Sequence, residues 1–358
     1  MSSNTEFTQL VESLSAKIKD YRSGEIDARS PHLVDRWVRQ FDENSRIHIL
    51  RELNHVLSHT YWSKARVETF FAALAKTSLD PNIGPRAYWS GCSLLEKQQK
   101  GESQVELTKL FKECLARGMH PGNPGKSIDN SAIYIDDFIF SGNHLISDMK
   151  EWISGFSTRE MTVTVIALGF HTGGTYFAEK RLKDDSKKDG RQLNLLFYGG
   201  KTFENRKIDS NTSEVLWPTC FPSTDAENYN SVQQWPCELR EPIQGWQTPI
   251  FSSEHGRQTL EREFLLAGLR IRSFSREPEA MLRPLGFGQF GFGFGSLLVS
   301  YRNCPNNCPL ALWWGDPEYP TNHPFHNWFP LLPRKTNEPK SPFLFEADVD
   351  DYDPFADE

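Results

Sequence analysis

The sequence predicts an α/β fold in which helices cover both faces of a mostly parallel sheet. Between about residues 85 and 200, three short apolar segments are typical of strands: 132–136, 161–168 and 193–198. Segments with helical spacing of apolar side chains lie around them: 103–116, 144–154 and 173–183. Because strands that alternate with helices usually form parallel sheets, residues 85–214 are expected to be a doubly wound core.

The first 84 residues are expected to form a helical cap on this core. Apolar side chains recur at helical spacing from Phe7 to Ile18 and again from Leu33 to Phe41. Ser30-Pro31 is a typical helix start, with a capping residue followed by proline in the first turn. Stripes of this kind usually face a protein core, so we expect packing and not a binding surface.

Residues 215–342 are predicted to form an irregular C-terminal extension that is rich in aromatic residues and proline, with one helix near 255–268. The segment GFGQFGFGFGSLLVS at 286–300 alternates Gly and Phe. It lacks the strand-then-helix context of a dinucleotide fingerprint, which excludes a Rossmann site. Cys304 and Cys308 form a C-x₃-C pair, but no second cysteine pair accompanies them. Packing is therefore favoured over zinc binding.

The charge of the chain is concentrated at its C-terminus. The formal net charge is −7, and residues 343–358 alone contain seven acidic side chains and no Lys or Arg. The rest of the chain is near neutral, so direct binding of nucleic acid is not expected. The acidic tail is expected to be solvated and flexible. Because aromatic residues alternate with its acids, it is also a candidate segment for docking a protein partner.

The chain shows no sign of a membrane segment. No apolar run approaches the roughly 18 residues that a membrane-spanning helix needs. The start, MSSNTEFTQL, has neither the basic nor the apolar region of a signal peptide. We therefore expect a cytoplasmic protein that does not bind membranes, with its six cysteines as free thiols.

The segment AIYIDDFIFSGNHL at residues 132–145 carries the functional prediction. Asp136 and Asp137 are expected to end a strand, and a short loop leads to a helix that begins near His144. In parallel sheets, ligands bind beyond the carboxyl ends of the strands, and a helix N-terminus there binds anions. Carboxylates suit sugar hydroxyls or a hydrated Mg²⁺. A phosphorylated sugar is the ligand that needs both features.

The order of residues 133–142 resembles a motif of type I phosphoribosyltransferases, in which apolar residues, two acids and a Thr/Ser-Gly loop follow one another. The resemblance implies phosphoribosyl pyrophosphate as substrate or ligand and Mg²⁺ as cofactor. Asp136 and Asp137 would be the catalytic acids that contact the ribose hydroxyls and the metal. The resemblance assigns the 5′-phosphate to five residues of the loop and helix start: Ser141, Gly142, Asn143, His144 and Leu145.

Enzymes of this kind also need an earlier loop that holds pyrophosphate. The segment EKQQKGESQVEL at 96–107 is the best candidate, because Lys100, Gly101 and Ser103 offer charge, a hinge and a donor ahead of a predicted helix. The alternative is an ordinary helix start with Ser103 as its cap. His171 follows the second predicted strand and could face the same crevice, although a lone histidine there is more often structural.

The whole chain is also similar to bacterial phosphoribosyltransferase-like proteins of conflict or phage-defence gene neighbourhoods, through Trp37 and Phe41 and through its Trp/Pro-rich C-terminal region. This similarity implies an effector that transfers or binds a phosphoribosyl group. Asn143 and His144 depart from the family's usual Gly and Thr or Ser. The alternative is therefore an inactive nucleotide-sensing or scaffold subunit of a defence complex, with protein partners at the aromatic C-terminal region or the acidic tail.

Overall fold

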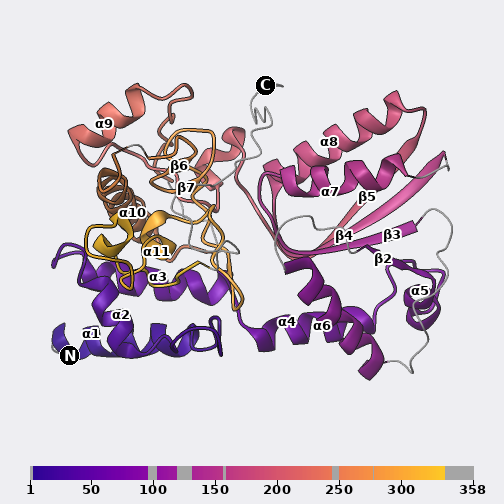
Figure 1. Ribbon diagram of the computed structural model, residues 1–358, viewed down its shortest axis with the longest axis horizontal. Helices are drawn as coiled ribbons and strands as arrows, with labels where there is room; N and C mark the ends of the chain where they lie inside the picture. Colours follow the sequence, from indigo (N-terminus) through magenta and orange to yellow (C-terminus); the bar gives the residue numbers. More distant parts are fainter. Residues whose placement is uncertain are drawn as a thin grey trace. The chain divides into compact units, whose positions relative to one another are not determined.

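The computed structural model of the protein describes residues 3–95, 103–118, 131–155, 159–243, 250–276 and 278–334 (Figure 1). Contacts group residues 64–203 into one compact unit, which we call the sheet unit. They group the described residues up to Ser63 with those from Glu204 to 334 into a second, which we call the flanking unit. Among the described residues, no helix has both the length and the apolar character needed to cross a membrane.

The sheet unit is built on four parallel strands in the order β2-β3-β4-β5, which confirms the predicted parallel α/β sheet. The strands have these bounds: β2 Ser93–Leu95, β3 Ser131–Ile139, β4 Glu160–His171 and β5 Gln192–Phe203. β3 does not end at the two aspartates as expected. Phe138 and Ile139 are buried apolar residues that pair with β4, so the strand continues to Ile139.

Helices lie on both faces of this sheet, as predicted. They have these bounds: α4 Lys64–Ala75, α5 Pro85–Gly91, α6 Ser103–Gly118, α7 Asn143–Ser154 and α8 Thr172–Lys188. Figure 1 shows α7 and α8 on one side of the sheet and α4 and α6 on the other. α4 belongs to this unit because Phe71 packs on Phe111 of α6, with ring centroids 5.3 Å apart. Contacts thus place the unit's start at Lys64, not at residue 85 as the sequence suggested.

The flanking unit combines the N-terminal helices with the C-terminal region. Its elements have these bounds: α1 Ser3–Lys17, α2 Pro31–Val38, α3 Arg46–Thr60, β1 Tyr61–Trp62, η1 Lys207–Thr212, α9 Thr224–Ser231, α10 Glu254–Ser273, β6 Leu282–Arg283, β7 Gly286–Phe287, β8 Val299–Ser300, α11 Leu310–Trp313 and η2 Pro324–Asn327. Trp37 shows why they fold together: its ring lies 6.3 Å from that of Phe264, and its Nε1–H donates to the Ala311 carbonyl at 2.8 Å. The Trp37–Phe41 pair is therefore part of this unit's core.

Cys304 and Cys308 lie in the flanking unit and are both fully buried. Across the part of the chain that the structure describes, no group of three or more His, Cys, Asp or Glu side chains could hold a metal ion. Burial raises the pKa of the Cys308 thiol, and the neighbouring Cys304 raises it further. A raised pKa keeps the Cys308 thiol protonated and unreactive, and the burial of both side chains is typical of packing cysteines.

Two strand-to-helix junctions pack tightly against each other in the sheet unit. Gly142, just before α7, has φ of 85°, and a Cβ there would lie 2.5 Å from the Gly174 carbonyl oxygen. A Cβ on Gly174, in the first turn of α8, would lie 1.7 Å from the Phe140 carbonyl oxygen. Only glycine fits at either position, because the backbones of the two junctions are in direct contact.

This packing predicts that Gly142→Ala costs more stability than Gly190→Ala. Both glycines have a left-handed backbone, but nothing lies within 4 Å of a Cβ at Gly190. The backbone strain, about 1 kcal/mol, is therefore common to both variants. Crowding should add about 1–3 kcal/mol for Gly142→Ala only. Urea denaturation of both variants measures the difference, and equal losses would show that the junctions are not tightly packed.

Candidate functional site

The candidate site lies where β3 leads through Phe140, Ser141 and Gly142 into α7. The helix after β2 and the helix after β3 lie on opposite faces of the sheet (Figure 1). The β3–α7 junction lies at the carboxyl edge of the sheet, the edge at which ligands bind in open α/β proteins. β2 ends at Leu95, which pairs with Tyr134 of β3. The part of β3 that carries the two aspartates therefore borders this edge of the sheet.

The start of α7 has the features of an anion site. Its N-cap is Gly142, and glycine has no side chain that could accept from the first amides of the helix. The first bond of the helix runs from the Ile146 N–H to the Gly142 carbonyl at 2.9 Å, so the amides of residues 143–145 precede it. The Ser141 hydroxyl oxygen lies 3.5 Å from the Asn143 nitrogen, and the His144 side chain is exposed. These consecutive amides and the hydroxyl occupy the positions that the motif assigned to a phosphate.

The two aspartates have different surroundings. Asp137 is partly exposed, and its Oδ1 accepts the Phe138 N–H at 2.8 Å. Asp136 is only 5% exposed, and its Oδ1 accepts the Asp137 N–H at 2.8 Å. Its Oδ2 lies 3.3 Å from the Tyr134 hydroxyl, on the face that α7 covers. Of the pair, Asp137 is thus the acid better placed to reach a ligand.

Tyr134 and Asp148 join this site, and the sequence analysis missed both. The Tyr134 hydroxyl donates to Asp148 Oδ2 of α7 at 2.7 Å, and both residues are buried. Burial and the charges of Asp136 and Asp148 raise the pKa of Tyr134 well above its usual value. One sequence signal could have identified Asp148. It is an acid in the apolar stripe of the predicted helix 144–154, next to the core residues Leu145 and Met149.

His171 has a structural role at the same edge, in agreement with the interpretation of a lone histidine after a strand. Its Nδ1 lies 3.1 Å from the Ile139 carbonyl, and its ring stacks on Phe140 with centroids 5.1 Å apart. Burial lowers the pKa of His171 to about 4. The ring is therefore neutral at physiological pH and holds β4 to the end of β3.

The predicted pyrophosphate loop is only partly described. Lys100 and Gly101 lie outside the described residues, so their assignment stays a prediction. Ser103 begins α6, and its assignment to pyrophosphate or to capping stays a prediction. The acidic tail at 343–358 also lies outside the described residues.

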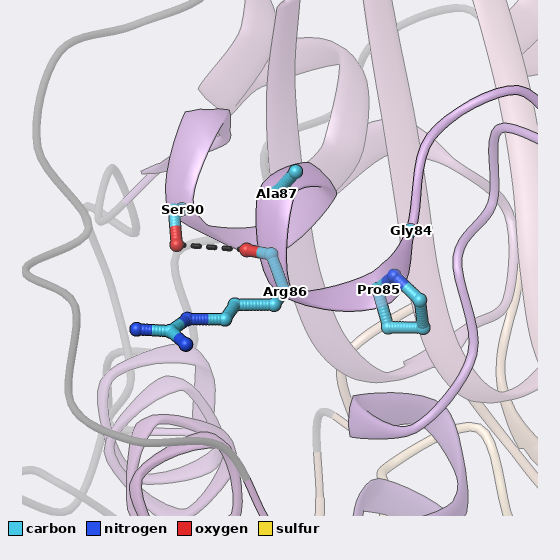
Figure 2. A pocket seen from close by; sticks show the side chains of 5 residues that line it. All are labelled: Gly84, Pro85, Arg86, Ala87 and Ser90. Carbon is cyan, nitrogen blue, oxygen red and sulfur yellow. Dashed lines mark hydrogen bonds between the residues drawn. The ribbon is translucent and has the colours of Figure 1, made fainter.

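A shallow depression lies elsewhere in the sheet unit, at the start of α5. It has a volume of ≈ 450 Å³ and is lined by Gly84, Pro85, Arg86, Ala87 and Ser90 (Figure 2). The Ser90 hydroxyl is used within the helix, where it donates to the Arg86 carbonyl at 2.7 Å. The depression contains none of the motif residues and brings no acids together. We therefore place the candidate site at the end of β3.

A parallel sheet with two acids and a Ser-Gly turn at a β-α junction is the arrangement expected of a phosphoribosyltransferase-like protein. The chain belongs to the PRTase-CE family, whose model matches residues 34–334. No curated protein and no solved structure matches the chain. Because the family match extends over both units, the flanking unit is part of what the family shares.

The pKa of His171 predicts a pH dependence of stability. Its ordinary value is 6.5, so the unfolded chain takes up a proton below that pH, whereas the folded chain resists protonation down to about 4. This stabilisation is therefore present above pH 6.5 and is lost as the pH falls toward 4, by up to about 3 kcal/mol. Urea denaturation at pH 7 and pH 4.5 should show a smaller loss in His171→Gln than in the unmodified protein.

The matched control for this measurement is His144→Gln, which removes an exposed histidine from the same region. It should leave the pH dependence of stability as it is in the unmodified protein. An equal pH dependence in His171→Gln and the unmodified protein would contradict the structural account of His171.

Proposed function

We propose that the protein binds phosphoribosyl pyrophosphate, or a related phosphorylated ribose, together with Mg²⁺ at the β3–α7 junction. The observation that carries this proposal is that the partly exposed Asp137 lies on β3, the strand whose carboxyl end leads through Ser141 and Gly142 into α7 at the carboxyl edge of a parallel sheet. Membership of a phosphoribosyltransferase-like family supports the same ligand class. Asp137 would accept hydrogen bonds from the ribose hydroxyls, and the amides of residues 143–145 would hold the 5′-phosphate.

The residues present suit a Mg²⁺ that arrives with its ligand. Mg²⁺ commonly binds one or two carboxylates, substrate phosphates and several waters. Within the described residues, no group of three metal-binding side chains exists, so the phosphates and waters would supply most of the ligands. Asp137 is the carboxylate that could contact the hydrated ion, whereas the buried Asp136 would act behind it. The ion would neutralise charge on the pyrophosphate.

If the protein is a transferase, its reaction is displacement of pyrophosphate from the anomeric carbon of the ribose. The described residues would contribute by position and electrostatics: the α7 amides fix one end of the ligand, and Asp137 fixes the sugar. A partner or an acceptor base would supply the attacking atom.

The second candidate is a sensor that binds the same ligand without turnover. Asn143 and His144 favour it, because they stand where the phosphoribosyltransferase motif has smaller residues. The buried, neutral His171 also favours the sensor. Its Nδ1 faces the Ile139 carbonyl and its ring is covered by Phe140, so it is not placed to act as a catalytic base. On the resemblance alone, either candidate is also proposed to act as an effector or subunit in bacterial defence against phage.

Calorimetric titration with phosphoribosyl pyrophosphate and Mg²⁺ tests the proposal. Asp137→Asn should weaken binding by about tenfold or more, since it removes a charged acceptor of hydrogen bonds from the sugar. The control is Asp189→Asn, an exposed acid at the other end of α8, about 25 Å along that helix. Equal binding by Asp137→Asn and the unmodified protein would contradict the proposed site.

Release of pyrophosphate in the same samples separates the two candidates. Turnover that Asp137→Asn abolishes supports the transferase, and binding without release supports the sensor. A phage challenge of cells that carry either variant tests the defence role: protection lost only with Asp137→Asn is expected.

A further inference from the structure

Three buried side chains connect β3 to α7 beneath the proposed ligand site. Tyr134 is fully buried, and Asp136 and Asp148 are 5% and 6% exposed. The Tyr134 hydroxyl lies 2.7 Å from Asp148 Oδ2 and 3.3 Å from Asp136 Oδ2. A tyrosine has a single O–H, and the shorter distance directs it to Asp148. The hydroxyl thus lies between an acid of the strand and an acid of the helix.

The Asp136 carboxylate also contacts the backbone of Asp137, the acid proposed to face the ligand. Asp136 Oδ1 accepts the Asp137 N–H at 2.8 Å, so the orientation of the Asp136 carboxylate fixes the peptide that carries Asp137. Asp137 Oδ1 in turn accepts the Phe138 N–H at 2.8 Å, which limits the rotation of its side chain. The Tyr134–Asp148 bond therefore ties α7 to β3, the strand whose backbone carries Asp136 and Asp137.

Helix α7 carries both Asp148 and the amides that are proposed to hold the phosphate. Asp148 lies in the second turn of α7, whose first turn provides the amides proposed to hold phosphate. Because a helix is rigid over this length, fixing Asp148 relative to β3 also fixes those amides relative to Asp137. Gly142 and Gly174 also restrain the junction, through close backbone contact. The position of α7 relative to β3 is thus restrained by the buried Tyr134–Asp148 bond and by the close backbone contact at Gly142 and Gly174.

We infer that Tyr134 and Asp148 are positioning residues, which hold the hydroxyl-binding Asp137 at a fixed separation from the phosphate-binding amides of α7. This inference rests on the proposed function and adds the residues that set the geometry of its site. A ligand that spans both ends depends on that separation, and small displacements of such groups weaken binding strongly. A ligand that touches only the amides does not depend on it.

The test compares ribose 5-phosphate with inorganic phosphate as calorimetric probes, each with Mg²⁺. Tyr134→Phe should weaken binding of ribose 5-phosphate by about 10-fold to 100-fold and leave binding of inorganic phosphate within about twofold. Asp148→Leu, which removes the acceptor, should behave like Tyr134→Phe, and the double variant should be no worse than either, because one interaction is lost. Asp148→Asn keeps an oxygen that accepts the hydroxyl and should restore binding of ribose 5-phosphate.

Tyr21→Phe is the matched control for loss of a buried hydroxyl. The Tyr21 hydroxyl donates to the Pro333 carbonyl at 2.9 Å within the flanking unit, so its removal costs stability but should leave both affinities unchanged. Thermal melting of each variant identifies a temperature at which all are folded, and affinities are compared there.

The outcomes separate this inference from the proposed function. If the unmodified protein binds ribose 5-phosphate and Tyr134→Phe binds it equally well, only the positioning role is overturned. A parallel loss of both ligands in Tyr134→Phe also overturns it, because general loosening of the site would explain that result. If the unmodified protein binds no phosphorylated ribose, the proposed function fails, and the positioning role fails with it.

Discussion

The close contact between the two strand-to-helix junctions of the sheet unit fixes the geometry of the candidate site. A Cβ on Gly174 would lie 1.7 Å from the Phe140 carbonyl oxygen, so the backbone after β3 rests directly on the first turn of α8. This contact fixes where α7 begins, and the buried Tyr134–Asp148 bond fixes how α7 lies on β3. His171 adds a third restraint through Ile139. The candidate site is therefore the meeting point of several rigid elements, which suits recognition of a ligand with two polar ends.

Much of this architecture could be predicted from local patterns. Apolar strands such as 161–168 and the stripe around Leu145 and Met149 show their periodicity directly, and the parallel sheet followed from their alternation. Long-range partners could not be predicted in this way. β3 continues past the aspartates because Phe138 pairs with Gly169, and the N-terminal helices join the C-terminal region because Trp37 meets Phe264. Such partners are far apart in sequence and leave no local signal.

The candidate site illustrates the same limit. The acids and the Ser-Gly turn were recognisable as a motif, but two adjacent aspartates look equivalent in a sequence. Neighbouring residues of a strand point to opposite faces, so only one of them faces the side that α7 covers. Which acid that is depends on the position of the helix: Asp136 lies under α7, and Asp137 remains partly exposed. Asp148 joins them because α7 packs on β3, a contact that no spacing rule specifies.

The central claim is that a sugar phosphate binds across Asp137 and the first turn of α7. The most direct measurement is a titration of the isotope-labelled protein with ribose 5-phosphate, followed through the nuclear magnetic resonance signals of its backbone amides. The account predicts that the amides of residues 142–145 and of Asp137 shift most, because they would donate to the phosphate or adjoin the sugar. Shifts concentrated at the depression at the start of α5, with the α7 amides unchanged, would contradict it.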